Sequence, residues 1–228
     1  MTSFAALPTL HVEGKDDLYT IAGLLERHGV SMLAAQRPFR ISTSENPDAK
    51  EEGVAALLES MADAIRNATD RPIGFVVDVD VKVADRWQAV CARLREAGLS
   101  PPNACPNDGY FGQLENYPHQ VGVWLMPDCI SDHGTLEHLI KTLIPVGDLL
   151  FPHAGKATQK AERLGAMFGA ANHNKAVLHC WLAWQERPGV PYGTAINAKF
   201  LAHDSPEAIA FLRWLKRLFG LSALAHIA

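Results

Sequence analysis

Short apolar runs alternate with amphipathic segments along the first part of the chain. The run Leu7–Val12 leads into Lys15–His28, where apolar residues recur at close to helical spacing. Ile73–Val79, with the sequence IGFVVDV, has the β-branched and aromatic composition of a buried parallel strand. Val83–Ala97 follows as a helix that Gly98 closes. The alternation therefore predicts consecutive βα units.

Further strands and helices extend this alternation towards residue 145. Ala49–Asn67 shows apolar residues at three- and four-residue intervals, which predicts an amphipathic helix. Val30–Ser42 is a candidate for a second strand, in which Pro38 would have to lie at an edge of the sheet or break the strand. Gln120–Met126 reads as another strand and Thr135–Leu143 as the helix after it. We expect an α/β fold, a Rossmannoid parallel sheet of about four strands flanked by helices.

Two regions depart from the alternation. Residues 100–118 are rich in Pro, Asn, Gly and Asp, which predicts a long irregular connection. After Pro145 the pattern is helical with no convincing strand, and we expect residues 1–150 to form the α/β core and residues 151–228 a helical extension packed on it. The helical segments expected in the extension are Gly155–Gly169, Lys175–Gln185 and Pro206–Phe219.

Composition narrows the class of protein. With 228 residues and 48% hydrophobic residues, the chain can bury a core without disulfides. Its four cysteines include no CxxC pair, which argues against a zinc ribbon or a disulfide framework and favours a reducing cytoplasm. No apolar run approaches the roughly 20 residues that cross a bilayer, and the start lacks the pattern of a signal peptide. We therefore expect a cytoplasmic protein without a membrane segment.

Charge is unevenly distributed along the chain. Residues 1–150 contain 12 Lys and Arg against 21 Asp and Glu, whereas residues 151–228 contain 9 against 4. An acidic first part and a basic last part are compatible with a metal site beside a phosphate-binding surface, and equally with ordinary solvated faces.

Acidic residues stand at the ends of the predicted strands. Ligands of a parallel α/β sheet bind outside the carboxyl ends of its strands, so Glu13, Asp78, Asp80 and Asp128 are the first candidates. If the strand continues through Asp78 and Asp80, both side chains leave one face, roughly 6.6 Å apart. Clustered carboxylates require a cation or a proton, and Mg²⁺ or Mn²⁺ suits such hard oxygen ligands. For Asp128 alone, capping of a helix is the simpler interpretation.

Two motifs resemble those of a known family. Gly14-Lys15 is not a phosphate-binding P-loop, because Asp16 follows where that motif needs Ser or Thr. VEGKDD at residues 12–17 instead resembles the first signature of the Toprim (topoisomerase/primase) superfamily, and VVDVD at residues 76–80 resembles its DxD signature. The resemblance covers roughly residues 7–145. GTLEHLI around Glu137 and LHCWLAWQE at residues 178–186 are similar to uncharacterised Toprim-related proteins with a helical C-terminal tail.

The Toprim resemblance implies roles for individual residues. Glu13 corresponds to the general acid/base, and Asp78 and Asp80 correspond to the carboxylates that hold the divalent metal. Asp128 and Glu137 are further candidate ligands, although a Glu in the first turn of a helix is also stabilised by the helix dipole alone.

Basic residues are the candidate contacts to nucleic acid. Lys156, Lys160 and Arg163 share one face of a predicted helix and can approach a phosphate backbone, though an ordinary solvated face would show the same pattern. The candidates are Lys15, Lys156, Lys160, Arg163 and Lys175.

We expect a Mg²⁺- or Mn²⁺-dependent nuclease that acts on DNA or RNA. One alternative is a non-catalytic nucleic-acid-binding or regulatory subunit that works with a separate ATPase, for example in a defence system. Another is a phosphotransfer enzyme for small phosphoesters. A topoisomerase is disfavoured because the chain is short and its tyrosines lack a strand-cleaving context. Assembly into a homo-oligomer is left open.

Overall fold

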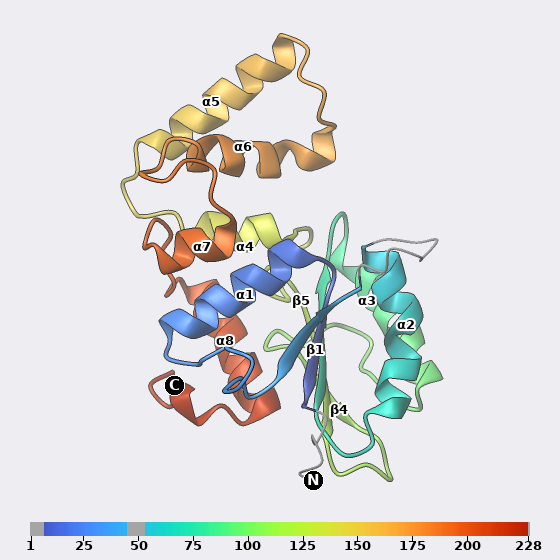
Figure 1. Ribbon diagram of the computed structural model, residues 1–228. Coiled ribbons are helices and arrows are strands. Elements are labelled where there is room, and N and C mark those ends of the chain that lie inside the picture. Colours follow the sequence, from blue (N-terminus) through green and yellow to red (C-terminus); the bar gives the residue numbers. More distant parts are fainter. Residues whose placement is uncertain (1–6, 45–52, 228) are drawn as a thin grey trace.

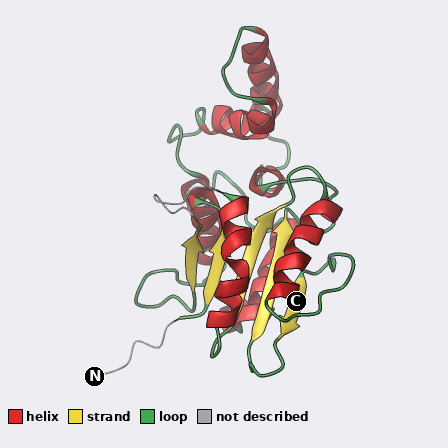
Figure 2. Ribbon diagram, turned by 90° about the vertical axis from the view of Figure 1, so that its right-hand side faces the viewer, coloured by secondary structure: helices red, strands yellow, loops and turns green. Residues whose placement is uncertain are grey.

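The computed structural model, which describes residues 7–44 and 53–227, is built around a five-stranded sheet with helices on both faces (Figure 1 and Figure 2). The strands lie in the order β2-β1-β3-β5-β4. Their bounds are Thr9–Val12 for β1, Arg40–Thr43 for β2, Ile73–Asp78 for β3, Tyr110–Gln113 for β4 and Gln120–Met126 for β5.

Four of the strands are parallel. β1 lies between β2 and β3, and β3 pairs along its whole length with β5, from Ile73 opposite Val121 to Asp78 opposite Met126. Five of the six residues of β3 are buried, because helices cover both of its faces. The predicted α/β class, with a mostly parallel sheet flanked by helices, is confirmed.

The fifth strand was not expected from the sequence. β4 lies within residues 100–118, which were predicted to be irregular, and it pairs antiparallel with β5, Tyr110 opposite Val123 and Gln113 opposite Gln120. Only four residues long, β4 is flanked by the Gly, Pro and Asn residues that suggested a loop. Its buried Tyr110 and half-buried Phe111 attach it to the core.

One face of the sheet carries α2 (Val54–Asn67) and α3 (Val83–Glu96), which lie side by side (Figure 1). The buried residues of α2 recur at the helical spacing that the sequence showed. The predicted start of this helix at residue 49 lies outside the described residues. The buried side chains of α2 are Leu57, Met61, Ala62 and Ile65.

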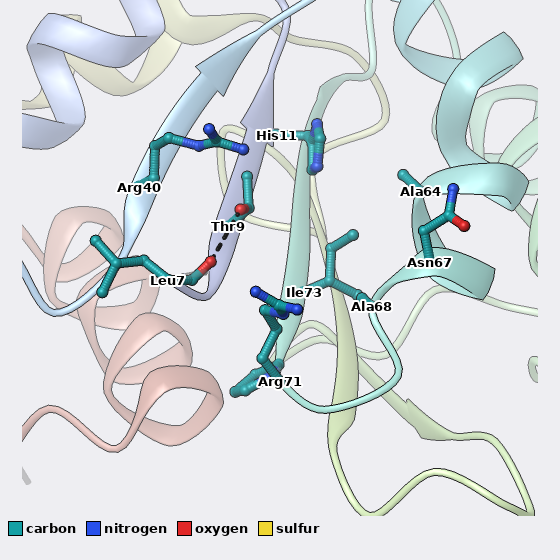
Figure 3. Close-up of a pocket in the computed structure, with 10 residues that line it drawn as sticks. Leu7, Thr9, His11, Arg40, Ala64, Asn67, Ala68, Arg71 and Ile73 are labelled. Carbon is teal, nitrogen blue, oxygen red and sulfur yellow. Dashed lines mark hydrogen bonds between the residues drawn. The ribbon is translucent and has the colours of Figure 1, made fainter. Parts of the chain in front are cut away.

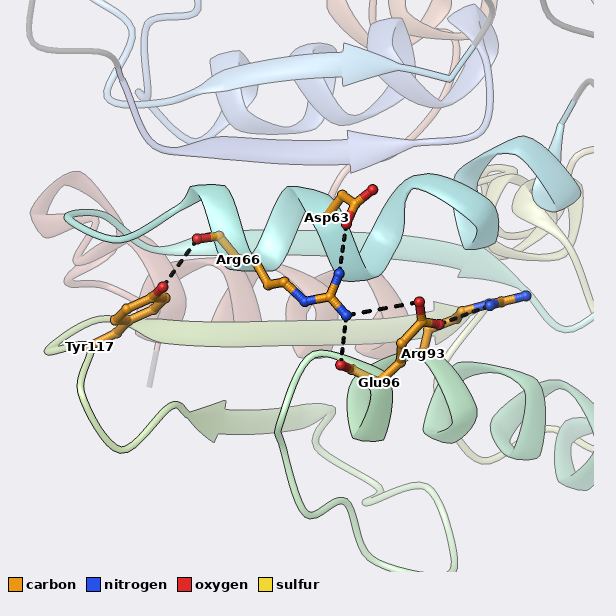
Figure 4. Close-up of polar contacts among 5 residues, drawn as sticks. All are labelled: Asp63, Arg66, Arg93, Glu96 and Tyr117. Carbon is orange, nitrogen blue, oxygen red and sulfur yellow. Dashed lines mark hydrogen bonds and ion pairs between the residues drawn. The ribbon is translucent and has the colours of Figure 1, made fainter.

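A polar cluster joins these two helices near their C-terminal ends (Figure 4). The guanidinium of Arg66 on α2 donates to Asp63 Oδ1 at 2.7 Å and to the backbone oxygen of Glu96 on α3 at 2.8 Å. Arg93 donates to the carboxylate of the same Glu96 at 2.9 Å. The hydroxyl of Tyr117, which precedes β5, donates to the backbone oxygen of Arg66 at 3.2 Å. The cluster fixes the ends of α2, α3 and the β4–β5 connection to one another.

The opposite face is covered by α1 (Lys15–Arg27) and α8 (Pro206–Phe219) (Figure 1). Ser205 caps α8 and Pro206 is its first residue, while Gly220 ends it in the left-handed conformation. Trp214 of α8 packs against Trp124 of β5 with ring centroids 5.8 Å apart. The hydrophobic core therefore continues through the predicted boundary at residue 150.

α4, α5 and α6 lie beyond the carboxyl ends of the parallel strands, and α7 packs against α1 (Figure 1). α5 and α6 pack together as a projecting pair, with α6 between α5 and the rest of the molecule (Figure 1). Among the described residues, no helix is long and apolar enough to cross a membrane. The bounds are Leu136–Thr142 for α4, Leu150–Arg163 for α5, His173–Leu182 for α6, Tyr192–Asn197 for α7, Ala170–Asn172 for the 3₁₀ turn η1 and Ser222–Leu224 for η2.

Candidate functional site

An acidic cavity lies at the carboxyl ends of β1 and β3. It has a volume of about 430 Å³ and is also bounded by the N-terminal turns of α1 and α4 and by α6. A cavity at this end of the strands is where a parallel α/β sheet places its ligands. Its lining comprises Glu13, Gly14, Lys15, Asp16, Asp17, Gly53, Asp78, Leu136, Glu137 and Lys175.

Glu13 and Asp78 form the floor of the cavity, on neighbouring strands. Glu13 directly follows β1 and Asp78 is the last residue of β3. Oε1 of Glu13 accepts a hydrogen bond of 2.8 Å from the backbone N–H of Asp78. Burial, with the charges of Asp17 and Asp80, raises the pKa of Glu13 to about 7, although the hydrogen bond and Arg86 oppose the rise. Glu13 can therefore gain or lose a proton near neutral pH.

Asp78 receives a hydrogen bond from the helix that follows β5. Its Oδ1 accepts from the backbone N–H of Leu136, the first residue of α4, at 3.0 Å. Burial raises the pKa of Asp78 well above its usual range, and the charges of Glu13, Asp17 and Glu137 add to the rise. Glu137 is fixed beside it, because the hydroxyl of Thr135 donates to Glu137 Oε2 at 2.7 Å.

Asp17 is a site residue that the sequence reasoning missed. It lies in the first turn of α1, is buried, and accepts a hydrogen bond of 3.0 Å from the backbone N–H of Gly14. Burial raises its pKa to about 6, and the charges of Glu137 and Asp16 also raise it, against the effect of the Gly14 hydrogen bond. The motif VEGKDD contained the signal, but Asp17 looked like an ordinary first-turn acid of a helix.

Lys175 brings a positive charge from α6 to the rim of the cavity. Its Nζ donates to Asp16 Oδ2 at 2.8 Å across 159 residues of sequence. Burial lowers the pKa of Lys175, but the hydrogen bond and charge of Asp16, with the charges of Glu137 and Asp17, outweigh this and raise it overall. Lys175 therefore stays protonated and offsets part of the negative charge of the cavity.

Asp80 does not share the face of Asp78. β3 ends at Asp78, and Asp80 has a left-handed backbone with a φ of 61° and bridges to Gly134. Its carboxylate pairs with Arg86 of α3 at 2.5 Å, beside a separate cavity. The strand was expected to continue through both Asp78 and Asp80, but the chain turns after Asp78.

Asp128 also lies outside the acidic cavity, in the turn after β5. Its Oδ1 accepts from the backbone N–H groups of Ile130 and Ser131, at 3.0 and 2.7 Å, and its Oδ2 accepts from the hydroxyl of Ser131. Asp128 thus stabilises this turn. It does not cap a helix, as the simpler interpretation expected, because α4 begins only at Leu136 with Thr135 as its N-cap.

The basic candidates separate into two groups. Lys15 and Lys175 line the acidic cavity. Lys156, Lys160 and Arg163 lie on the exposed surface of α5, which Figure 1 places beyond α6 as seen from the sheet. The last three share the face that the sequence predicted, but they do not line the cavity.

The donor atoms of the cavity suit a hard divalent cation in type. Glu13 and Asp78 each engage one oxygen with a backbone N–H, and the second oxygen of each accepts no hydrogen bond from the described residues. Glu137 adds a third carboxylate. Burial, and to a smaller extent the neighbouring carboxylates, raise the pKa values of Glu13 and Asp78, so a cation would favour their ionised forms. Within residues 7–44 and 53–227, however, no three Asp, Glu, His or Cys side chains are already grouped as ligands of one ion.

Comparison with known proteins gives one match. A family model described as "Protein of unknown function (DUF3226)" matches residues 8–220, which include every strand and all of the cavity-lining residues. Searches of curated proteins and of solved structures found no match.

Proposed function

The chain belongs to the DUF3226 family, and we propose that its acidic cavity is a divalent-cation site that cleaves phosphodiester bonds of nucleic acid. One observation carries the proposal: Glu13, Asp78 and Glu137 converge at the carboxyl ends of β1 and β3 with pKa values of the first two raised. The Toprim-like order of the two motifs supports it, because both motifs contribute to this one cavity.

Asp78 and Glu137 are the proposed ligands of Mg²⁺ or Mn²⁺, with Asp17 buried beside them. Such an ion, when bound, supplies positive charge that stabilises a phosphate and its developing negative charge. The backbone N–H of Leu136 orients Asp78, and the Thr135 hydroxyl orients Glu137. The cavity therefore offers oriented carboxylates from two different elements, β3 and α4.

Glu13 is the proposed general acid/base. A pKa of about 7 leaves comparable fractions of the acid and the carboxylate at neutral pH, which favours proton transfer in either direction. Its hydrogen bond from Asp78 holds the carboxylate in place. Lys175, whose pKa is raised, provides a permanent positive charge for a substrate phosphate.

Nucleic acid is the proposed substrate because α5, which packs on α6, has an exposed basic face, and α6 contributes Lys175 to the cavity. Lys156, Lys160 and Arg163 on α5 can contact the phosphate backbone away from the scissile bond, while Lys15 and Lys175 act at the cavity. The position of the α5 residues outside the cavity also fits the alternative of a small phosphoester, which would need only the cavity itself.

A non-catalytic role is the competing proposal. It is favoured by the absence, among the described side chains, of three ligands already grouped around one point. In that case the chain would bind nucleic acid or regulate a partner such as a separate ATPase, and its acidic cavity would not turn over substrate.

The test is a cleavage assay with single- and double-stranded DNA, RNA and small phosphodiesters, in Mg²⁺ or Mn²⁺. We expect the wild-type protein to cleave at least one nucleic acid, and Glu13→Gln and Asp78→Asn to lower the rate by at least a hundredfold. Glu59→Gln, on an exposed position of α2, is the matched control and should cleave normally. If the wild type leaves every substrate intact, the nuclease proposal fails and the non-catalytic role is preferred.

A further inference from the structure

The connection between α5 and α6 is an exposed apolar loop. Residues Leu164–Ala171 have the sequence LGAMFGAA, in which no side chain is charged or able to form a hydrogen bond. Leu164 and Met167 expose 77% and 99% of their surface. Contiguous apolar surface on a protein marks a contact with an apolar partner or with a membrane. We call residues Leu164–Ala171 the apolar tip.

The apolar tip is the end of a projecting arm. α5 and α6 pack on each other and extend together away from the sheet (Figure 1 and Figure 2). α5 ends at Arg163, and Gly165, with a φ of 96°, turns the chain. On either side of the tip, Nδ1 of His173 donates to Oε1 of Glu162 at 2.7 Å, which closes the base of the loop. The tip is therefore a defined loop that presents its largest side chains outwards.

Positive charge lies directly behind the apolar tip. Residues 150–182, which comprise α5, the tip and α6, contain four Lys and Arg against one Glu, a net charge of +3, whereas the whole chain has a net charge of -4. Lys156, Lys160 and Arg163 are exposed and form no ion pair with a carboxylate in the described ranges. The single acid, Glu162, is held at the base of the tip. The arm is thus apolar at its end and positive behind it.

The order of these groups along the arm matches the layers of a membrane surface. Lys160 lies roughly 6 Å and Lys156 roughly 12 Å behind Leu164 along the axis of α5. In a bilayer a polar layer roughly 5 to 8 Å thick covers the hydrocarbon on each side. An apolar end therefore reaches hydrocarbon while the basic residues stay among anionic headgroups. Nucleic acid is also anionic, but its bases are read largely through hydrogen bonds, which no side chain of the tip can form.

We propose that the apolar tip inserts into the surface of an anionic membrane. Leu164 and Met167 contact the lipid hydrocarbon, and Lys160 and Arg163 contact the headgroups. Apolar burial and electrostatic attraction act together here, and the two combined hold a protein at a membrane more firmly than either does alone. The contact is confined to the end of the arm, and the proposal does not depend on the function of the acidic cavity.

Co-sedimentation of the full chain with lipid vesicles tests the proposal. We expect binding to vesicles of equal parts phosphatidylserine and phosphatidylcholine, and binding at least tenfold weaker to phosphatidylcholine alone. Leu164→Ser combined with Met167→Ser should weaken binding to the mixed vesicles tenfold or more. Val146→Ser combined with Leu149→Ser is the matched control and should change the affinity less than twofold. Both control positions are highly exposed apolar residues, but they precede α5 and so lie at the end of that helix opposite to the tip.

A second pair of variants tests the contribution of charge. Arg163→Gln, beside the tip, should weaken binding to the mixed vesicles roughly fivefold. Arg40→Gln removes the same charge from an exposed arginine and should bind as the wild type does. Arg40 lines a cavity at the amino ends of the strands, at the opposite end of the sheet from the arm (Figure 3). Equal losses in the two variants would show a general attraction of cations without insertion of the tip, and would overturn the proposal.

Two further measurements locate the tip and distinguish lipid from nucleic acid. Lipids brominated on their acyl chains should quench the added fluorescence of Met167→Trp, relative to the wild type, and should not quench that of Val146→Trp. The double serine variant at the tip should bind single-stranded DNA as the wild type does. The proposal is overturned if the chain binds neither kind of vesicle, if the tip variant binds vesicles normally, or if it loses affinity for DNA and not for vesicles.

Discussion

The backbone N–H of Asp78 donates a 2.8 Å hydrogen bond to Oε1 of Glu13, so the residue that ends β3 is joined to the residue that follows β1. Only a fixed, inward-pointing Glu13 can make this contact, and the same position removes its carboxylate from water. Burial consequently raises the pKa of Glu13 to about 7. The ionised form of Glu13 is therefore tolerated in the folded protein at a cost.

That cost predicts how stability depends on pH. Glu13 loses its proton near 4.5 in the unfolded chain and near 7 in the folded one, so its contribution is complete below pH 4.5 and is lost as pH rises through 7. The unfolding free energy should decrease from pH 5 to pH 8 in the wild type. The decrease should be smaller in Glu13→Gln, by on the order of 2 kcal/mol. Gln keeps an oxygen that accepts from Asp78.

Urea denaturation at pH 5 and pH 8, without divalent ions, measures this difference. The exposed substitution Glu59→Gln is the control and should follow the wild type at both pH values. Equal pH dependence in Glu13→Gln and the wild type would show that Glu13 ionises as freely in the folded protein as in the unfolded chain.

A divalent ion should relieve the same repulsion. At pH 8, Mg²⁺ or Mn²⁺ at about ten times its dissociation constant adds about 1.4 kcal/mol, or roughly 3 to 6 °C in melting temperature for a chain of this size. Asp78→Asn and Glu137→Gln should abolish the shift. Asp80→Asn and Asp128→Asn should retain it, since these residues lie in an ion pair and a turn outside the acidic cavity.

Differential scanning fluorimetry with and without the ion provides the comparison, each variant being measured against its own ion-free melting temperature. A shift that survives in Asp78→Asn but disappears in Asp80→Asn would place the cation at the other cavity, beside Arg86.

The basic face of α5 should act on nucleic-acid affinity and not on the cleavage rate. Replacing Lys156, Lys160 and Arg163 together by Gln should reduce the dependence of log affinity on log salt concentration by roughly 2 to 3, one increment for each phosphate that the variant no longer neutralises. Lys175→Met should instead lower the cleavage rate, because Lys175 lines the acidic cavity. Fluorescence anisotropy at several salt concentrations measures the affinity, and the cleavage assay measures the rate. An unchanged salt dependence in the triple variant would show that α5 does not contact the nucleic acid.

The crossing of α1 and α7 should not tolerate a methyl group. A Cβ at Gly193 of α7 would lie 2.0 Å from the backbone oxygen of Tyr19 on α1, so the helices would have to separate. Gly193→Ala should cost about 3 kcal/mol or more and lower the melting temperature by roughly 6 to 12 °C.

Gly155 on α5 offers the matched control for that substitution. A Cβ there meets no described heavy atom within 4 Å, so Gly155→Ala should stabilise the protein slightly through higher helix propensity. Thermal denaturation of both variants measures the contrast. Similar melting temperatures for the two would contradict the close approach of α1 and α7.

Periodicity was sufficient to predict β1, β3, β5 and most helices, because their burial follows from the alternation itself. The strand predicted at Val30–Ser42 is confined to Arg40–Thr43, and the residues before Arg40 form turns and irregular structure. β5 has the predicted bounds Gln120–Met126, and β3 ends one residue before its prediction. β4 could not be predicted, since it has only four residues and its pairing partner lies across a turn. The hydrophobic pattern of four residues does not predict the pairing of β4 with β5 when the residues around β4 are typical of a loop.

The candidate site was predictable where it depends on the ends of strands. Glu13 and Asp78 meet because β1 and β3 are neighbours, which parallel topology implies. The positions of Asp80 and Asp128 depend on how the chain turns after each strand, a property of backbone angles that spacing does not reveal. Asp17 was overlooked because it has the sequence context of an ordinary first-turn acid, and its burial in the folded protein does not follow from that context.

The ion pair between Lys175 and Asp16 connects positions 159 residues apart. A ribosome synthesises Glu13, Asp17, Asp78 and Glu137 long before it reaches Lys175. A nascent chain that ends before α6 therefore contains these acids without the lysine that partly balances them, and their mutual repulsion opposes closure of the cavity. Formation of the acidic site is thus expected late in folding, after α6 has docked. A fragment that stops at residue 150 lacks Lys175, and we therefore expect it to form the acidic site less completely than the whole chain does.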